Sequence, residues 1–125
     1  MRVAFLREKE VTLGPVPNDG PLPTQLALSP PEHAGQGAIE LAAWRKTAPV
    51  ESIFELGPID WLRRTAGLGV RGAPSADALS MVVRYAFHEL NLERLETDPV
   101  QPESIEALRA AGFVPTGDRW SAFRS

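Results

Sequence analysis

The chain has 125 residues, of which 43% are apolar and 23% are charged, and its formal net charge is -3. At this length one hydrophobic core forms without a stabilising metal or disulfide, so we expect a single domain over residues 1–125. The sequence contains no cysteine, which excludes thiolate nucleophiles, zinc clusters and iron–sulfur sites. The acidic balance, without any basic run, argues against nucleic-acid binding.

The sequence also carries no membrane or export signal of the usual kind. No apolar stretch approaches the ~20 residues that a membrane-spanning helix needs. The short apolar run Val3–Leu6 is followed at once by Arg7, Glu8 and Lys9, which is the wrong order for a signal peptide. We therefore expect a cytoplasmic protein that binds neither membrane nor nucleic acid.

The first part of the chain predicts strands and loops. Two apolar runs within Arg2–Val16 predict one or two strands. Repeated prolines and glycines in residues 14–37 disfavour any regular helix and predict a long loop region. Ala38–Lys46 fits a strand or a helix, and we favour a strand, because Thr47–Val50 predicts a turn and Ser52–Leu56 a partner strand.

The next part contains the strongest periodic signal. After Gly57-Pro58, Ile59–Trp61 and Thr65–Val70 predict a further extended segment. Ser75–Leu90 predicts a long amphipathic helix, with Ser75 as the N-cap. Its apolar face consists of Leu79, Val82, Val83, Ala86, Phe87 and Leu90.

The last part alternates strand and helix. Arg94–Thr97 predicts a short strand. Pro102–Ala111 predicts a second helix, because proline suits the first helical position and Gly112 follows the end. Phe113-Val114 and Trp120–Phe123 predict two terminal strands joined by a turn.

Short motifs follow one another in a fixed order over residues 52–125. They are Ile59-Asp60-Trp61, Arg64–Val70, Asp77-Ala78-Leu79, Tyr85–Arg94, Ser104-Ile105, Ala111–Val114 and Gly117. In this order and spacing they resemble the GNAT acetyltransferases, and among them the RimJ/RimL-like branch of N-terminal acetyltransferases.

The resemblance implies an α+β fold whose central mixed sheet is mostly antiparallel. A long helix and a shorter C-terminal helix accompany the sheet, and the first two helices of the family are reduced or missing over the proline-rich residues 14–37. It also implies acetyl-CoA as co-substrate and no metal. The acetyl-CoA would lie where the strand ending near Val70 separates from the strand beginning near Arg94.

The resemblance further assigns cofactor contacts by position. Strand backbone would pair with the pantetheine arm, and the loop before the long helix would hold the pyrophosphate with backbone N–H groups at the helix N-terminus. Carried over to this chain, the cofactor-binding residues are Leu68, Gly69, Val70, Arg71, Gly72, Ala73, Ser75, Ala76 and Gln101.

The chain departs from the family pattern at three places. The loop Arg71–Ala76 keeps one glycine, and Pro74 offers no N–H to a phosphate. Leu108 stands where many relatives have a tyrosine that protonates the leaving thiolate. Residues 14–37 replace the helices that shape the acceptor site. These departures leave open whether the chain is an enzyme.

One carboxylate is our candidate general base. Deprotonating an amine needs a carboxylate, or a water that it holds, within hydrogen-bond reach of the nitrogen. Glu55, on the strand beside the predicted active site, is the candidate for this catalytic role, with Glu40 and Asp60 as rivals. The ordinary alternative is a solvated strand carboxylate.

Other residues have plain structural interpretations. Arg63, Arg64 and Arg71 form the one local positive cluster of the sequence, which either attracts an anion or makes surface ion pairs. We expect His88 on the surface and Tyr85 in a packing role. The tryptophans are expected as core or interface anchors: Trp44, Trp61 and Trp120.

Two functional hypotheses from different classes follow. The first is a GNAT-like N-acetyltransferase that transfers acetyl from acetyl-CoA to a primary amine, whose identity the sequence does not give. The alternative is a catalytically degenerate GNAT-fold protein that acts as a binding or dimerisation module. A third possibility is an enzyme completed in trans, in which a second subunit covers the sheet face that the missing helices leave bare. We expect a homodimer in all three cases, because a sheet face without its helices is costly to expose.

Overall fold

The described residues form nine strands, which make a single sheet. This computed structural model of the chain describes residues 6–8, 10–17, 20–30, 39–45 and 49–124. The strands lie in the order β1-β2-β4-β5-β6-β3-β7-β9-β8. Their bounds are β1 Leu6–Glu8, β2 Val11–Gly14, β3 Leu26–Ser29, β4 Ile39–Arg45, β5 Ser52–Asp60, β6 Thr65–Gly72, β7 Arg94–Pro99, β8 Val114–Thr116 and β9 Arg119–Phe123.

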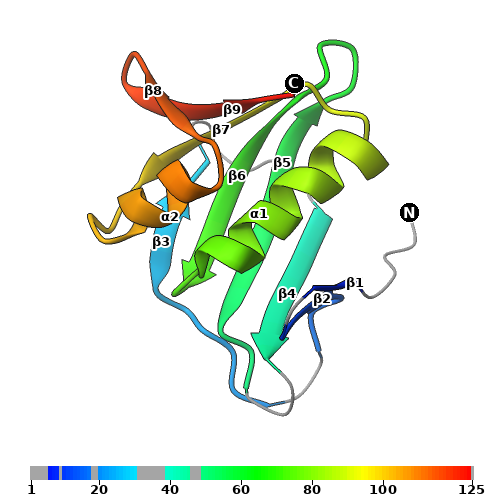
Figure 1. Cartoon of the computed structure of the whole chain (residues 1–125), viewed down its shortest axis with the longest axis vertical. Coiled ribbons are helices and arrows are strands. Elements are labelled where there is room, and N and C mark those ends of the chain that lie inside the picture. Colours follow the sequence, from blue (N-terminus) through cyan, green and yellow to red (C-terminus); the bar gives the residue numbers. More distant parts are fainter. Residues whose placement is uncertain (1–5, 9, 18–19, 31–38, 46–48, 125) are drawn as a thin grey trace.

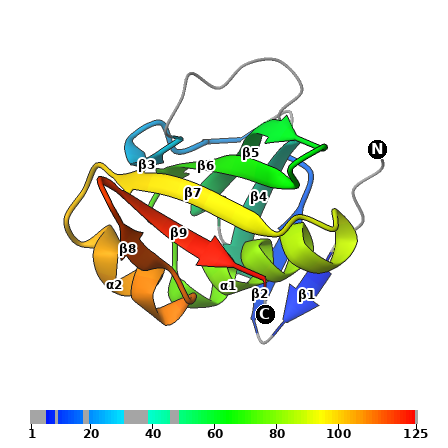
Figure 2. The same cartoon turned by 90° about the horizontal axis from the view of Figure 1, so that it is seen from above.

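Both helices lie on the same face of the sheet (Figures 1 and 2). They are α1, Ala76–Arg84, which continues as a π-helical turn over Tyr85–Glu89, and α2, Ser104–Ala110. The core lies between these helices and the sheet, and its largest fully buried side chains include Phe54, Phe113 and Leu68. We call the opposite side the second face. No described helix covers it, and strand alternation places Glu40, Glu55, Arg71 and Glu96 there.

The predicted fold class is confirmed. The sheet is antiparallel except for the pair β6–β7, which is parallel. The strand interpretation of residues 38–46 is confirmed over Ile39–Arg45, which pairs with β5 through Leu41↔Phe54 and Ala42↔Ile53. Residues 2–5, 38 and 46–48, on which parts of the strand and turn predictions fall, lie outside the described residues.

The long helix follows its predicted pattern. The Ser75 Oγ accepts a hydrogen bond of 3.1 Å from the backbone N–H of Ala78, as expected of an N-cap. All six residues of the predicted apolar face are buried. The second helix and the terminal hairpin also occur as predicted, and Gly112 has a φ of +96° just after α2.

Two predictions about the strands were wrong. The expected break at Gly57-Pro58 is absent: β5 runs through both residues, with an irregular register between Leu56 and Ile59. The proline-rich residues 14–37 were predicted as loop, yet Leu26–Ser29 forms strand β3 in the interior of the sheet. No helix forms in residues 20–30, and residues 18–19 and 31–38 lie outside the described part.

Tyr85 offers a direct test of the packing around α1. Burial raises the pKa of its phenol above the ordinary value of 10.0, and the charge of Glu89 raises it further. Because the unfolded chain would lose this proton first, the stability due to the neutral phenol is present below pH 10.0 and is lost as pH rises through the folded pKa.

We therefore expect the phenolate absorbance of the folded protein to appear at higher pH than that of the chain unfolded in denaturant. The protein has a single tyrosine, so the signal belongs to Tyr85 alone. A folded midpoint at or below the unfolded one would contradict the buried position of the phenol.

Candidate functional site

The central feature of the sheet is the separation of its two parallel strands. β6 and β7 pair directly at Thr65↔Arg94, Ala66↔Leu95 and Gly67↔Glu96. Beyond these positions they diverge, and β3 lies between them (Figure 1). We call this region the fork and define it as β6 residues 65–72 together with β7 residues 94–99.

Strand β3 pairs with both arms of the fork. Along β6 it pairs at Leu28↔Val70 and Leu26↔Arg71, with an irregular register between them. Along β7 it pairs at Leu28↔Pro99 and Ser29↔Asp98. Both pairings are antiparallel, and the side chain of Leu28 is fully buried in the main core.

A buried threonine lies where the arms of the fork part. The Thr97 hydroxyl is 2.7 Å from the carbonyl oxygen of Leu68 on β6 and 3.2 Å from that of Ser29 on β3. It donates toward both carbonyls, and its residue is 0% exposed. The sequence analysis missed Thr97, because a threonine on a strand is common and its two partners are distant in the chain.

The predicted pantetheine strand has two different surfaces. Leu68 and Val70 point their side chains into the core beneath the helices. Gly69 lies directly across from Glu55 of β5 on the second face. A Cβ at Gly69 would lie 3.0 Å from the Cδ of Pro30, so the segment after β3 packs closely over this glycine.

Two backbone N–H groups of the predicted pyrophosphate loop already donate hydrogen bonds to other residues of the chain. Gly72 donates its N–H to the carbonyl of Gln25 at 2.8 Å, and Ala73 donates to Glu51 at 3.1 Å. Ser75 caps α1, and Ala76 is its first residue. Gln101 follows β7 and its side chain donates to the carbonyl of Leu26 at 3.3 Å. The structure therefore places Gly72 and Gln101 against β3 and the residue preceding it.

A cavity of about 390 Å³ on the second face brings the predicted base and one rival together. Glu40 and Glu55 are register partners on β4 and β5. Glu40 forms an ion pair with Arg71 at 3.3 Å, whereas Glu55 makes no ion pair within the described residues. The lining residues are Leu26, Pro30, Glu40, Ile53, Glu55, Gly69, Val70 and Arg71.

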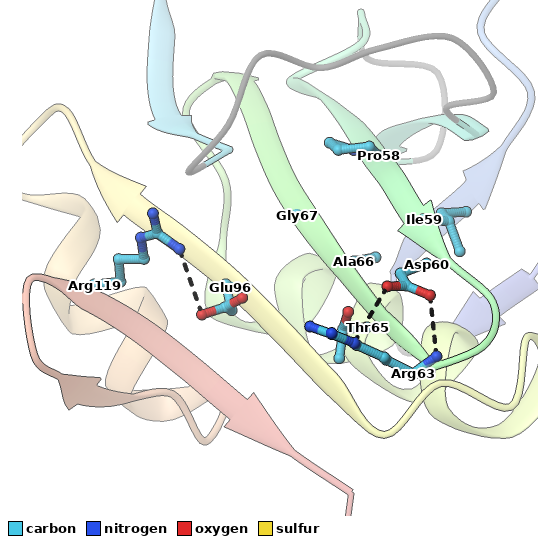
Figure 3. Close-up of a pocket in the computed structure, with 9 residues that line it drawn as sticks. All are labelled: Pro58, Ile59, Asp60, Arg63, Thr65, Ala66, Gly67, Glu96 and Arg119. Carbon is cyan, nitrogen blue, oxygen red and sulfur yellow. Dashed lines mark hydrogen bonds and ion pairs between the residues drawn. The ribbon is translucent and has the colours of Figure 1, made fainter.

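A second cavity, of about 350 Å³, lies near the closed end of the fork (Figure 3). Asp60, the other rival base, accepts hydrogen bonds from the backbone N–H groups of Leu62 and Arg63 and pairs with the Arg63 side chain at 3.9 Å. Across the cavity Arg119 reaches Glu96 at 3.8 Å. Both carboxylates therefore face an arginine.

The predicted cluster of three arginines does not exist in the fold. Arg63 and Arg64 lie in the turn before β6, and Arg71 lies near its far end. Six residues of strand at ~3.3 Å each separate the two ends by about 20 Å. Arg63 and Arg71 each pair with a neighbouring carboxylate, so the sequence proximity of these residues does not create an anion site.

The remaining candidates have structural roles. Leu108 is fully buried in the core, and Tyr85 packs there as predicted. His88 is exposed, as expected. Trp120 packs against the core, whereas Trp61 is 55% exposed at a turn. Of the two predicted roles for Trp61, core or interface anchor, the core role is excluded and the interface role stays a prediction. Among the described residues no group of histidine and carboxylate side chains is arranged to hold a metal, and no helix is long and apolar enough to cross a membrane.

This arrangement of strands and helices is a GNAT-like α+β fold. The structure of spermidine N-acetyltransferase from Vibrio cholerae in complex with CoA and spermine matches it with a TM-score of 0.60 and 17% identity, over 70% of this chain and 66% of that one. The dodecameric structure of the same enzyme in an intermediate state gives a TM-score of 0.59 at 17% identity, over 70% and 66% of the two chains. A chimera of that enzyme with hSSAT gives 0.58 at 18% identity, over 67% and 66%.

These similarities extend over a part of each protein. The chain spans 66% of the length of the spermidine N-acetyltransferase structures named above. No protein-family model and no curated protein matches the sequence. The comparisons support the GNAT fold predicted from the motifs, and the RimJ/RimL-like branch stays a prediction.

Gly72 tests the geometry of the predicted pyrophosphate loop. Its φ is +100°, and a Cβ there would lie 2.3 Å from the carbonyl oxygen of Glu51 and 2.9 Å from Pro23 Cβ. We expect Gly72→Ala to lower the free energy of unfolding by about 1–3 kcal/mol from backbone strain, and by more where the clash cannot relax.

The matched control is Gly117→Ala, since Gly117 also has a positive φ, of +64°, but nothing lies within 4 Å of its Cβ position. Urea unfolding measures both variants. A Gly72→Ala variant as stable as Gly117→Ala would contradict the close approach of Gly72 to Glu51.

Proposed function

We propose that this protein is a GNAT-type N-acetyltransferase that acts on a primary amine. The observation that carries the proposal is the shared fold, in which a parallel strand pair separates beside a cavity that holds an available carboxylate. In this proposal acetyl-CoA supplies the acetyl group as a thioester. The amine is taken up on the second face, where Glu55 lines the cavity.

The backbone groups of the fork that acetyl-CoA would use are already engaged within the chain. The backbone groups that would meet the pantetheine arm already pair with β3, and the N–H groups of Gly72 and Ala73 already donate to Gln25 and Glu51. In the described conformation the cofactor therefore does not fit the fork. Acetyl transfer in this protein requires β3 to move.

Glu55 is the residue that we propose as base. An amine attacks a carbonyl only as the free base, so a proton must leave the ammonium form near the reaction site. Glu55 lines the cavity beside Gly69, and its carboxylate is not held by an arginine within the described residues. Glu40 and Asp60 are each paired, so their carboxylates are less available as proton acceptors.

Spermine is the first acceptor to test. The spermidine N-acetyltransferase of similar fold was crystallised with CoA and spermine. Two carboxylates, Glu40 and Glu55, and one arginine line the cavity, which favours a cationic ligand. A small monoamine and a short peptide with a free N-terminus complete the acceptor panel, because they separate polyamine specificity from a general amine preference.

The variant Glu55→Gln tests the base. We expect kcat with the best acceptor to fall by about 10²–10⁴-fold. The reaction is followed by release of the CoA thiol, which is free of background because the protein has no cysteine. The matched control is Glu40→Gln, which removes the neighbouring carboxylate and its exposed ion pair. A Glu55→Gln enzyme with unchanged kcat and pH profile would exclude this residue as base.

The occupied fork favours a second candidate function. A GNAT-fold protein whose own strand permanently fills the cofactor position would be a binding or dimerisation module without catalysis. Isothermal titration with acetyl-CoA separates the two: micromolar binding supports the enzyme, and no heat at millimolar ligand from any form of the protein supports the module. The homodimer remains a prediction that sedimentation velocity tests.

A further inference from the structure

Strand β3 is an insertion into an otherwise continuous sheet. After β2 the chain crosses to the far side of β6, where it forms β3. It then returns and forms β4, which lies beside β2 in the sheet. β6 and β7 already pair directly with each other at three positions. Without β3 the remaining eight strands would still form one unbroken sheet, so the fold does not need β3 to connect its two halves.

β3 makes specific contacts with both of its neighbouring strands. The carbonyl of Ala27 accepts the N–H of Val100 at 2.9 Å, and the carbonyl of Ser29 receives the Thr97 hydroxyl. Ala27 and Leu28 are fully buried, whereas Leu26 is 40% exposed.

The segments beside β3 limit its length. Thr24 and Gln25 before the strand are exposed. Pro23 before it and Pro30 after it have no N–H to donate to a neighbouring strand. The strand has four residues, and it is held by the buried side chains of Ala27 and Leu28 and by its hydrogen bonds to β6 and β7.

We propose that β3 is an autoinhibitory strand, which occupies the acetyl-CoA position in the fork and must leave before the cofactor binds. This inference rests on the proposed function. The pantetheine arm is an extended chain with amide groups, so it would compete for the same backbone groups of β6 that now pair with Leu26 and Leu28. The apparent Kd for acetyl-CoA is then the Kd of the released form divided by the fraction of molecules in which β3 is released.

A reversible covalent lock tests the inference directly. Ser29 and Asp98 are opposite each other in the antiparallel pair β3–β7, within the range of Cα separations that a disulfide spans. The double variant Ser29→Cys/Asp98→Cys carries the only two cysteines of the protein, because the natural sequence has none. Mass spectrometry after thiol labelling reports whether the bond has formed.

We expect the oxidised double variant to show no acetyl-CoA binding by isothermal titration, and the same sample after reduction to bind as the reduced single variants do. The single variants treated with the same oxidant and reductant are the controls. Equal affinity in the oxidised and reduced forms would overturn the inference and leave the acetyltransferase proposal intact.

A variant that releases β3 should change the affinity for acetyl-CoA in the opposite direction. Ala27→Glu places a charge at a fully buried position of β3 and should expel the strand. Leu22→Glu introduces the same charge at a position that is 38% exposed, and serves as the matched control. We expect Ala27→Glu to tighten the apparent Kd for acetyl-CoA by at least about tenfold and Leu22→Glu to leave it unchanged.

Hydrogen exchange verifies that release is local. In Ala27→Glu the amides of Gly72 and Val100, which donate to Gln25 and Ala27, should exchange faster, while the amides that pair β5 with β6 stay protected. Local release with no change in acetyl-CoA affinity would overturn the inference. If no form of the protein binds acetyl-CoA, the proposed function fails, and the autoinhibitory role fails with it.

Discussion

The sheet depends on how β6 and β7 satisfy their backbone groups once they separate. Two parallel strands that diverge leave unpaired N–H and C=O groups on facing edges, and such groups are costly when buried. Here β3 pairs with both edges and Thr97 donates its hydroxyl toward carbonyls on either side. The fork is therefore a site that recognises an extended backbone, and the chain itself supplies one.

The unequal cover of the two sheet faces follows from the same topology. The crossover from β6 to β7 and the connection after β7 place α1 and α2 on one side of the sheet (Figure 2). The hydrophobic core lies between these helices and the sheet. The second face keeps the charged strand residues, including Glu40, Glu55 and Arg71. Any chemistry on a polar ligand belongs on this second face, because it offers carboxylates rather than core packing.

The sequence analysis succeeded where one element carries its own pattern. The spacing of apolar residues in α1, the cap at Ser75 and the glycine after α2 are local signals, and each fixes an element without knowledge of its neighbours. The choice of a strand for Ile39–Arg45 was correct because the turn and the partner strand follow at once. Motif order was enough to indicate the GNAT fold.

The prediction failed where residues act through distant partners. Leu26–Ser29 is a short segment among prolines, and no local pattern predicts a strand there. It forms a strand because β6 and β7 both offer it backbone partners in the fork. Glu55 and Glu40 were separate candidates in the sequence, and the pairing of β4 with β5 brings them into one cavity. Arg63 and Arg71 are close in the chain but are separated by the length of β6.

The sequence by itself determined the helices and most of the strands, because periodicity, caps and turns act over a few residues. It indicated the class of fold only through motifs that resemble those of the GNAT family. The tertiary structure alone decided what lies in the fork and which backbone donors are already in use. It also decided which of the two cavity carboxylates, Glu40 or Glu55, has no arginine partner among the described residues. These properties depend on strand order and register. Such long-range pairings are set by the packing of the whole sheet, which no local pattern records.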